Sequence, residues 1–274
     1  MDAVLLEELS NRAMNVRRDV VSMIGMARSG YVASSLSAAD ILVWLYGAVL
    51  SIRPEEPLWE GRDRFVFDKA SASPALYAVL AERGFFGRDE LWGYRRMGST
   101  LQAFADARRT PGVDASCGSL GMGPGVSFGL AAALRDRNPA PRVFCFVGEN
   151  ELLEGATWET VMNETARRLG NFTLIVDRNG LRMSGADESP DPLEGQFRAF
   201  SWAVARADGH DMRALSAALA SLPTDRARVL IAATVGGKGI PSLEKNPSVD
   251  FSLDRQTTDD LLKELQTTRE RSPL

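Results

Sequence analysis

Three short runs of apolar residues in the second half of the chain give the clearest indication of secondary structure. Residues 142–147, 172–177 and 228–235 read RVFCFV, FTLIVD and RVLIAATV, without the alternation of a strand that has one wet face. Continuous apolar runs are typical of strands covered on both faces, as in parallel sheets. Segments with helical spacing separate them, over 151–169 and from 211 to about 222. The alternation predicts an α/β fold, a doubly wound, mostly parallel sheet with helices on both faces.

The first half of the chain is predicted to be mainly helical. Apolar residues at helical spacing predict a helix over 3–27. Ser37, with Asp40 three residues later, has the pattern of a helix N-cap. The remaining elements are predicted as strands at 64–67 and 202–207, and helices over 73–84, 89–97 and from a Gly-rich segment to about residue 136. We expect one domain over 1–274, whose polar residues 241–274 form a tail over the surface or over a partner.

Composition and charge exclude several classes of function. The chain has 274 residues and a net charge of −4, whereas a protein that binds nucleic acid favours a basic surface. The single histidine, His210, excludes a multi-histidine metal site and argues against a Ser-His-Asp triad. Two cysteines cannot form a disulfide framework, and residues 1–20 lack the basic-then-apolar pattern of a signal segment. We therefore expect a cytoplasmic protein that binds neither nucleic acid nor membrane.

Polar residues follow two of the predicted strands at the points where they end. Gly148-Glu149-Asn150-Glu151 follows the first, and residues 177–181 (DRNGL) follow the second. In parallel sheets, ligands bind at the carboxyl ends of the strands. The N–H groups of a helix start suit a phosphate, and Glu149 with the side-chain oxygen of Asn179 suits Mg²⁺. From the spacing alone, a simple turn is an equally good interpretation.

Short motifs around these two turns occur in a characteristic order. They are Ser29-Gly30, 34–40 (SSLSAAD), Lys69 with 72–77 (ASPALY), 110–113 (TPGV), 118–121 (GSLG), 151–155 (ELLEG), 158–159 (WE), 176–181 (VDRNGL), 208–211 (DGHD) and 237–239 (GKG). On these motifs, nearly the whole chain resembles the N-terminal, diphosphate-binding half of transketolases. The resemblance implies the thiamine-diphosphate-binding fold, with thiamine diphosphate (TPP) and Mg²⁺ bound between two subunits.

The resemblance also implies roles for single residues. Gly148, Glu149, Asn150, Asn179 and the backbone carbonyl of Leu181 would surround the diphosphate and the metal. Glu149, Asn179 and Leu181 would be the metal ligands.

Two further groups of residues follow from the same resemblance. Gly118, Ser119 and Leu120 would lie near the aminopyrimidine or the thiazolium of TPP. Glu154, on the helix after the metal loop, would be an interface or proton-relay carboxylate and is a candidate catalytic residue.

The chain departs from the family pattern in two places. The family's metal motif Gly-Asp-Gly is Gly148-Glu149-Asn150 here, so the carboxylate is one methylene longer and the loop must shift. Where transketolases line the substrate channel with histidines, this chain has Tyr31, Ser71, Phe104 and, by a looser match, Asp250. Tyr31, Ser71 and Phe104 are therefore further candidate catalytic residues, at the substrate site, and we expect that the substrate differs from ordinary sugar phosphates.

The carboxylate that activates the aminopyrimidine belongs, in this family, to a second domain for which 274 residues leave no room. We therefore interpret the chain as the N-terminal subunit of a split, TPP-dependent transketolase-like transferase of a two-carbon ketol or acyl unit. It would be active only with a transketolase C-terminal-like partner that supplies the pyrimidine-binding domain, as a heterotetramer of two plus two. The alternative is a non-catalytic or regulatory subunit built on the same fold.

His210 is open to two interpretations. It could contact a substrate, or it could fix the turn between a strand and the following helix. Its place in 208–211, directly before a predicted helix, favours the second interpretation.

Overall fold

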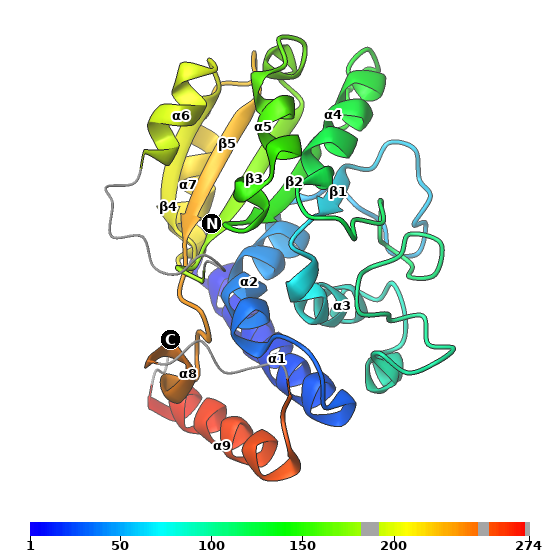
Figure 1. Cartoon of the computed structure of the whole chain (residues 1–274), viewed down its shortest axis with the longest axis vertical. Helices are drawn as coiled ribbons and strands as arrows, with labels where there is room; N and C mark the ends of the chain where they lie inside the picture. Colours follow the sequence, from blue (N-terminus) through cyan, green and yellow to red (C-terminus); the bar gives the residue numbers. More distant parts are fainter. Residues whose placement is uncertain (182–191, 246–251, 272–274) are drawn as a thin grey trace.

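A five-stranded parallel sheet forms the centre of the computed structural model, which describes residues 1–181, 192–245 and 252–271 (Figure 1). Its strands lie in the order β1-β2-β3-β5-β4. Their bounds are Arg64–Phe67 (β1), Val143–Gly148 (β2), Phe172–Arg178 (β3), Ala203–Asp208 (β4) and Arg228–Ala233 (β5). Every neighbouring pair is parallel, so all five strands end at one edge of the sheet. The predicted α/β fold with a parallel sheet is confirmed.

Helices cover both faces of this sheet. Alternate residues of β2 enter different cores: Phe144 and Phe146 pack with α1, α2 and α3, whereas Val143 and Cys145 pack with α4, α5 and α6. This double burial explains why the sequence of β2 is apolar without alternation. The helices are Ala3–Ala27 (α1), Val32–Trp44 (α2), Ser73–Glu82 (α3), Met122–Leu134 (α4), Gly155–Met162 (α5), Leu193–Ala199 (α6), Met212–Ser221 (α7), Pro241–Lys245 (α8) and Arg255–Arg271 (α9).

The start of α2 corrects one prediction. Ser37 is not an N-cap, because α2 begins at Val32 and Ser37 lies fully buried within it. Its hydroxyl bonds to Asp177, 140 residues away, so tertiary contacts explain a serine that resembles a local cap. A true cap exists at α1, where the Asp2 carboxylate accepts a 2.8 Å hydrogen bond from the N–H of Leu5.

Two predicted helices are shorter than their patterns suggest. The segment 151–169 is divided into a 3-10 turn, α5 and a second 3-10 turn. Asn163 ends α5 in extended conformation, and its side chain accepts hydrogen bonds from the N–H groups of Thr165 and Ala166 to begin the next turn. The segment 89–97 forms only a 3-10 helix, Arg88–Gly93.

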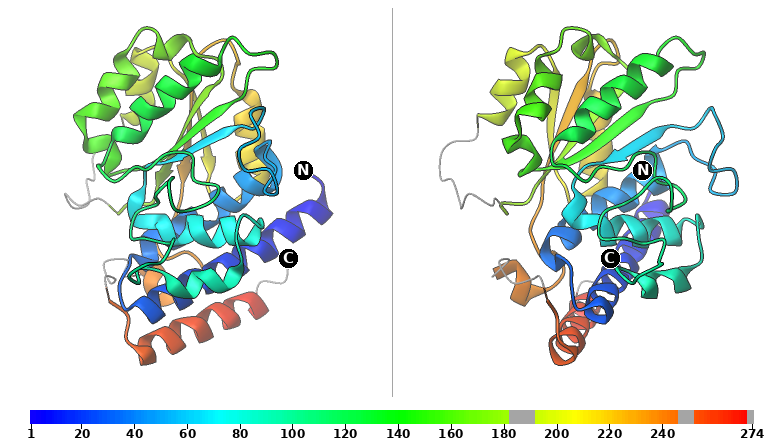
Figure 2. Two further views of the ribbon diagram at one scale, coloured as in Figure 1. Left: turned by 90° about the vertical axis from the view of Figure 1, so that its right-hand side faces the viewer. Right: turned by 45° about the vertical axis from the view of Figure 1, so that its right-hand side comes forward.

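The last described helix, α9, runs alongside α1 (Figure 2). Leu261 and Leu265 of α9 are buried in the same core as Val20 and Ile24 of α1. The predicted tail 241–274 therefore includes a helix that covers α1 within the chain itself.

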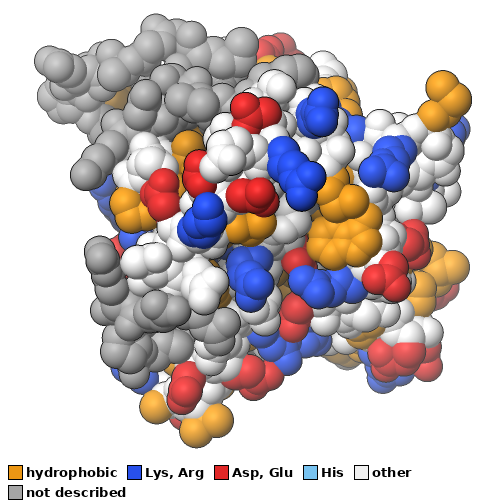
Figure 3. Space-filling view, turned by 90° about the horizontal axis from the view of Figure 1, so that it is seen from below, with side chains coloured by type: hydrophobic (Ala, Val, Ile, Leu, Met, Phe, Trp, Pro, Cys, Tyr) orange, Lys and Arg blue, Asp and Glu red, His pale blue; other side chains and the backbone are white. Residues whose placement is uncertain are grey.

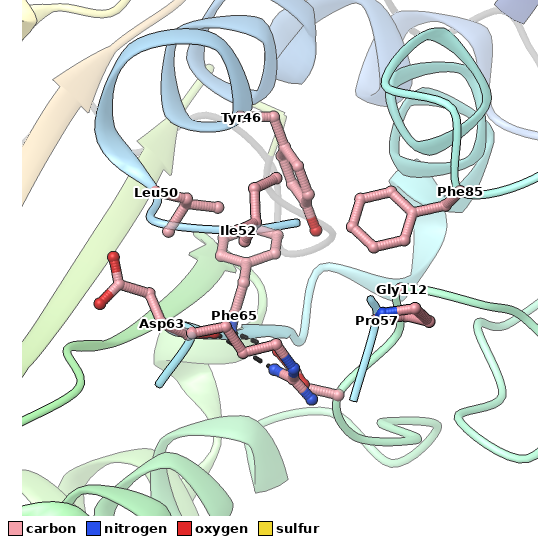
Figure 4. Close-up of a pocket in the computed structure, with 10 residues that line it drawn as sticks. Tyr46, Leu50, Ile52, Pro57, Asp63, Phe65, Phe85 and Gly112 are labelled. Carbon is pink, nitrogen blue, oxygen red and sulfur yellow. Dashed lines mark hydrogen bonds and ion pairs between the residues drawn. The ribbon is translucent and has the colours of Figure 1, made fainter. Parts of the chain in front are cut away.

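Two hollows lie away from the ends of the strands among the described residues: an open one of about 440 Å³ between α1 and α9, and a small cavity beside β1. At the end of the molecule where α9 lies, acidic and basic side chains are mixed with scattered hydrophobic ones (Figure 3). The cavity beside β1, lined by Tyr46, Phe65 and Phe85 among others, has a volume of about 10 Å³, which is room for one water molecule (Figure 4).

One described helical stretch, Val32–Val49, is long and apolar enough to span a membrane, and 78% of it is buried inside the structure.

Candidate functional site

Two turns lie side by side at the carboxyl ends of β2 and β3. Gly148, the last residue of β2, is paired with Asp177 of β3 in the sheet register. The turns are joined by side chains: the Glu149 carboxylate accepts a 2.6 Å hydrogen bond from the N–H of Gly180, and the side-chain amide of Asn150 donates to the Leu181 carbonyl at 3.4 Å. The structure thus brings together Glu149, Asn150 and Leu181, which come from two separate turns of the chain.

Asn179 completes this group of oxygen donors. Its side-chain oxygen accepts a hydrogen bond from the N–H of Leu181 at 3.0 Å, and its NH₂ donates to Ser37. Glu149 is only 5% exposed. The Arg178 guanidinium lies 3.7 Å from Oε1 of Glu149, the oxygen that does not bond to Gly180. A carboxylate, an amide oxygen and a backbone carbonyl are hard donors of the kind that Mg²⁺ prefers, so the residues present fit the ion. The described residues contain no group of three or more His, Cys, Asp or Glu side chains that could hold a metal ion, and a set with one carboxylate does not need such a group.

A buried ion pair lies beneath these turns. The ammonium of Lys69 is 2.6 Å from Oδ2 of Asp177, and both side chains are almost inaccessible to solvent. Thr234 donates its hydroxyl proton to the other oxygen of Asp177. Buried charges persist only when paired and hydrogen-bonded, so this pair ties the end of β1 to β3 and β5. The signal for it in the sequence is the position of Lys69 shortly after a buried strand.

The Gly-rich segment leads into α4 and rests on α5. Gly118 and Ser119 are exposed, and Leu120 is half-buried. Gly121 precedes the helix with a φ of +78°, and a Cβ there would lie 2.6 Å from the Cβ of Glu154. The segment therefore lies directly on Glu154, the half-buried carboxylate that the sequence singled out.

Two carboxyl groups at this edge are buried, Asp68 and Glu151, and their burial cannot be recognised in the sequence. Asp68 follows β1, is 1% exposed, and accepts no hydrogen bond of good geometry among the described residues. Burial, reinforced by the nearby charge of Glu151, raises the pKa of Asp68 to about 7, although the backbone N–H groups of Gly121 and Gly123 oppose the shift. Burial also raises the pKa of Glu151, which accepts a 2.8 Å hydrogen bond from the N–H of Gly148. Nothing in the local pattern distinguishes these residues from exposed acids.

The residues at the histidine positions lie on three separate segments of the chain. Tyr31 directly precedes α2 and is 42% exposed, whereas the Ser71 hydroxyl is 2.9 Å from that of Ser34 in the same helix. Phe104 is 48% exposed, and its ring lies 3.9 Å from where a Cβ of Gly118 would be. An aromatic ring thus stands beside the Gly-rich segment. Asp250 lies outside the described residues.

His210 connects the loops after β4 and β5 to α2. Its Nδ1 is 2.6 Å from Oδ2 of Asp40, and its Nε2 accepts a 2.9 Å hydrogen bond from the N–H of Val235. Burial opposes ionisation of Asp40, but the Arg17 guanidinium and His210 together hold the pKa of Asp40 below its usual value. These contacts are those of a residue that fixes loops.

The sheet order, the buried strands and the polar turns at the ends of β2 and β3 define a parallel α/β domain of the class that binds ligands at the carboxyl ends of its strands. More specifically, the chain belongs to the transketolase family: residues 9–260 match the family model of the transketolase thiamine diphosphate binding domain. The resemblance predicted from the motifs is confirmed, and the family is one of TPP-dependent transferases.

Several similar curated proteins match over most of their length, whereas the transketolases of Pongo abelii and Homo sapiens, 32% identical, match over 40% of theirs. A putative transketolase family protein y4mO of Sinorhizobium fredii is 36% identical over 86% of this chain and 87% of its own. The 6-deoxy-6-sulfo-D-fructose transketolase subunit SqwG of a Clostridium species is 34% identical over 85% and 86%. An apulose-4-phosphate transketolase subunit of Actinobacillus succinogenes is 31% identical over 88% and 89%.

Solved transketolase structures share the fold. The transketolase of Campylobacter jejuni superposes with a TM-score of 0.77 at 26% identity and covers 99% of this chain, but only 49% of the transketolase chain is matched. The chain therefore spans about half the length of the solved transketolase.

Proposed function

We propose that the chain is the diphosphate-binding subunit of a split transketolase-like enzyme that transfers a two-carbon ketol or acyl unit with TPP and Mg²⁺. When bound, TPP supplies the nucleophilic carbon to which the two-carbon unit is attached. The chain's own residues bind and orient the diphosphate: the turns after β2 and β3 hold the cation and phosphate oxygens, and Gly118, Ser119 and Leu120 line the cofactor. Glu154, beneath that segment, is the candidate proton-relay carboxylate.

One observation carries this proposal. Glu149, Asn179 and Leu181 are linked through two short turns, by the 2.6 Å bond from Gly180 to Glu149 and the 3.0 Å bond from Leu181 to Asn179. Their oxygens can therefore converge on one cation without a rearrangement of the sheet. Glu149 in place of the family's aspartate is accommodated because its longer side chain reaches the opposite turn.

The substrate is proposed to differ from the ordinary sugar phosphate pairs. Tyr31, Ser71 and Phe104 stand at the positions where the family has imidazoles, so this chain offers no titrating ring there near neutral pH. Phe104 also makes its part of the site less polar. Two relatives are named for 6-deoxy-6-sulfo-D-fructose and for apulose-4-phosphate, which supports a specialised donor or acceptor.

The partner is proposed to be a transketolase C-terminal-like subunit that supplies the pyrimidine-binding domain. Relatives of a length similar to this chain are named as subunits, which supports a divided enzyme. Two-fold symmetry is the common arrangement of soluble oligomers, so we propose two copies of each subunit. The two free, buried cysteines, Cys117 and Cys145, suit a reducing cytoplasm.

A non-catalytic subunit is the second candidate, and one observation favours it. The Glu149 carboxylate already receives the N–H of Gly180 and lies near Arg178, so part of its charge is satisfied within the chain. Native mass spectrometry of the chain co-expressed with its partner decides between the two. A heterotetramer that carries two TPP and two Mg²⁺ supports the enzyme, whereas a complex that takes up neither supports the non-catalytic subunit.

A further inference from the structure

The hydroxyl of Ser37 lies at the centre of a buried cluster under the turn that follows β3. It accepts hydrogen bonds from the Asn179 side-chain NH₂ and the Lys69 ammonium, each at 3.0 Å. It also lies 2.8 Å from Oδ2 of Asp177. Ser37 itself is fully buried in α2, and its contacts with Lys69 and Asp177 are buried, whereas Asn179 is half-buried.

The contacts around Ser37 determine the direction in which its hydroxyl proton points. The Lys69 ammonium can only donate, and the Asp177 carboxylate, which is paired with that ammonium, accepts. The hydroxyl proton therefore points to Asp177, and both lone pairs of Ser37 accept, one from Lys69 and one from Asn179. The carbonyl of Ser34, also 3.0 Å away, is a neutral and weaker acceptor that receives Lys69 at 2.9 Å.

This arrangement determines which way the Asn179 amide points. If the amide were flipped, its oxygen would face a lone pair of Ser37, and its NH₂ would face the N–H of Leu181. In the observed orientation both ends are satisfied, at 3.0 Å each. The flipped amide would leave both of these contacts unmade, so the two contacts favour the observed orientation.

We propose that Ser37, held by Lys69 and Asp177, is a positioning residue that presents the side-chain oxygen of Asn179 to the divalent cation. The role of Ser37 toward the cation rests on the proposed function, whereas its effect on the orientation of the Asn179 amide does not. The cluster joins α2, β3 and the segment after β1, so the oxygen is fixed by the packed core. Mg²⁺ demands nearly ideal octahedral geometry, whereas Ca²⁺ tolerates irregular sites. Loss of this orientation should therefore weaken the binding of Mg²⁺ more than the binding of Ca²⁺.

NMR spectroscopy of the full chain without cofactor tests the orientation. The measured quantity is the rate at which the side-chain NH₂ protons of Asn179 exchange with solvent. The variant Asn179→Asp assigns the signals by removing them. Ser37→Ala should speed the exchange about fivefold or more, and Ser37→Cys, which keeps the size and a weak acceptor, should be intermediate. Ser35→Ala is the matched control, since Ser35 is buried in the same helix but bonds to the Tyr31 carbonyl. Equal rates in the wild type, Ser37→Ala and Ser35→Ala would overturn the proposal.

The role toward the metal is tested by calorimetry with Mg²⁺ and with Ca²⁺ in the presence of TPP and the partner subunit. Ser37→Ala should weaken Mg²⁺ binding about tenfold or more and Ca²⁺ binding distinctly less. An equal loss for both ions would contradict positioning. If the wild-type complex takes up no Mg²⁺, the proposed function fails, while the exchange rates still decide whether Ser37 orients Asn179.

Discussion

The carboxylate of Glu149 accepts a 2.6 Å hydrogen bond from the N–H of Gly180, which lies 31 residues later in the chain. The bond crosses from the turn after β2 to the turn after β3. It brings an acidic side chain next to Asn179 and Leu181, and so forms the set of oxygens on which the proposed cation site depends.

Glu149→Ala should weaken Mg²⁺-dependent TPP binding by about 100-fold or more, because it removes the only acidic ligand of the proposed site. Glu149→Asp, which restores the side-chain length of the family, should keep or improve binding. Isothermal titration calorimetry with Mg²⁺ and with EDTA measures both. Glu164→Ala removes an exposed acid that pairs with Arg167 at the surface, and is the control. Unchanged affinity in Glu149→Ala would refute the assignment.

Asp68 should make the stability of the metal-free chain depend on pH. Its pKa is about 7 in the folded protein and near the ordinary value of 3.8 in the unfolded chain, so the folded state binds the proton more tightly. The contribution of this group to stability is therefore fully present below pH 4 and is lost as pH rises through 7, by up to roughly 4 kcal/mol. Asp68→Asn should flatten the decline of melting temperature between about pH 5 and pH 8. A decline as steep as in the wild type would contradict this role of Asp68.

Lys69→Ala should destabilise the chain by about 3–5 kcal/mol, because it leaves the buried Asp177 carboxylate without its cation. The measurement is chemical denaturation followed by circular dichroism. Lys263→Ala removes an exposed lysine that pairs with Asp260 at the surface of α9, and should change stability by less than about 0.5 kcal/mol. Equal effects of the two substitutions would show that the Lys69 pair is dispensable.

The assembled enzyme should have little activity with a ketopentose phosphate as donor and an aldopentose phosphate as acceptor. The physical reason is the loss of imidazoles at Tyr31, Ser71 and Phe104, which removes partners for sugar hydroxyls. A coupled assay of product formation measures the rate. Turnover of about 10 s⁻¹, typical of enzymes on their own substrates, would show that the substrate has not changed.

The fold could be predicted from the sequence because its strands are buried on both faces. Continuous apolar runs at 142–147 and 172–177 are typical of parallel sheets, and the helices between them are regular enough to recognise. The ends of the helices could be predicted less well, because side-chain hydrogen bonds take the place of backbone hydrogen bonds there. The break between Leu153 and Gly155 depends on Thr157 donating to the Glu151 carbonyl, which a helical pattern does not reveal.

Within the site, the residues on the two turns could be named because the order of motifs around them is specific. The supporting residues could not be named, because their partners are distant in the chain. Ser37 has the local pattern of a helix cap, yet its contacts are to Lys69, Asp177 and Asn179. Asp68 resembles an exposed acid at the end of a strand, and only the packing of α4 against it buries the carboxylate.

If the chain is one half of a divided TPP enzyme, turnover requires both halves and is greatest when they are present in equal amounts. The direct measurement mixes the separately purified chain and its partner in varying ratios, with TPP, Mg²⁺ and a ketose donor, and follows donor consumption. We predict no turnover by either protein on its own, a rate that rises to a maximum at equal amounts of the two, and no rate in EDTA. Full turnover by this chain without a partner, or no turnover at any ratio with donors that the partner's relatives use, would contradict the division of the enzyme between two chains.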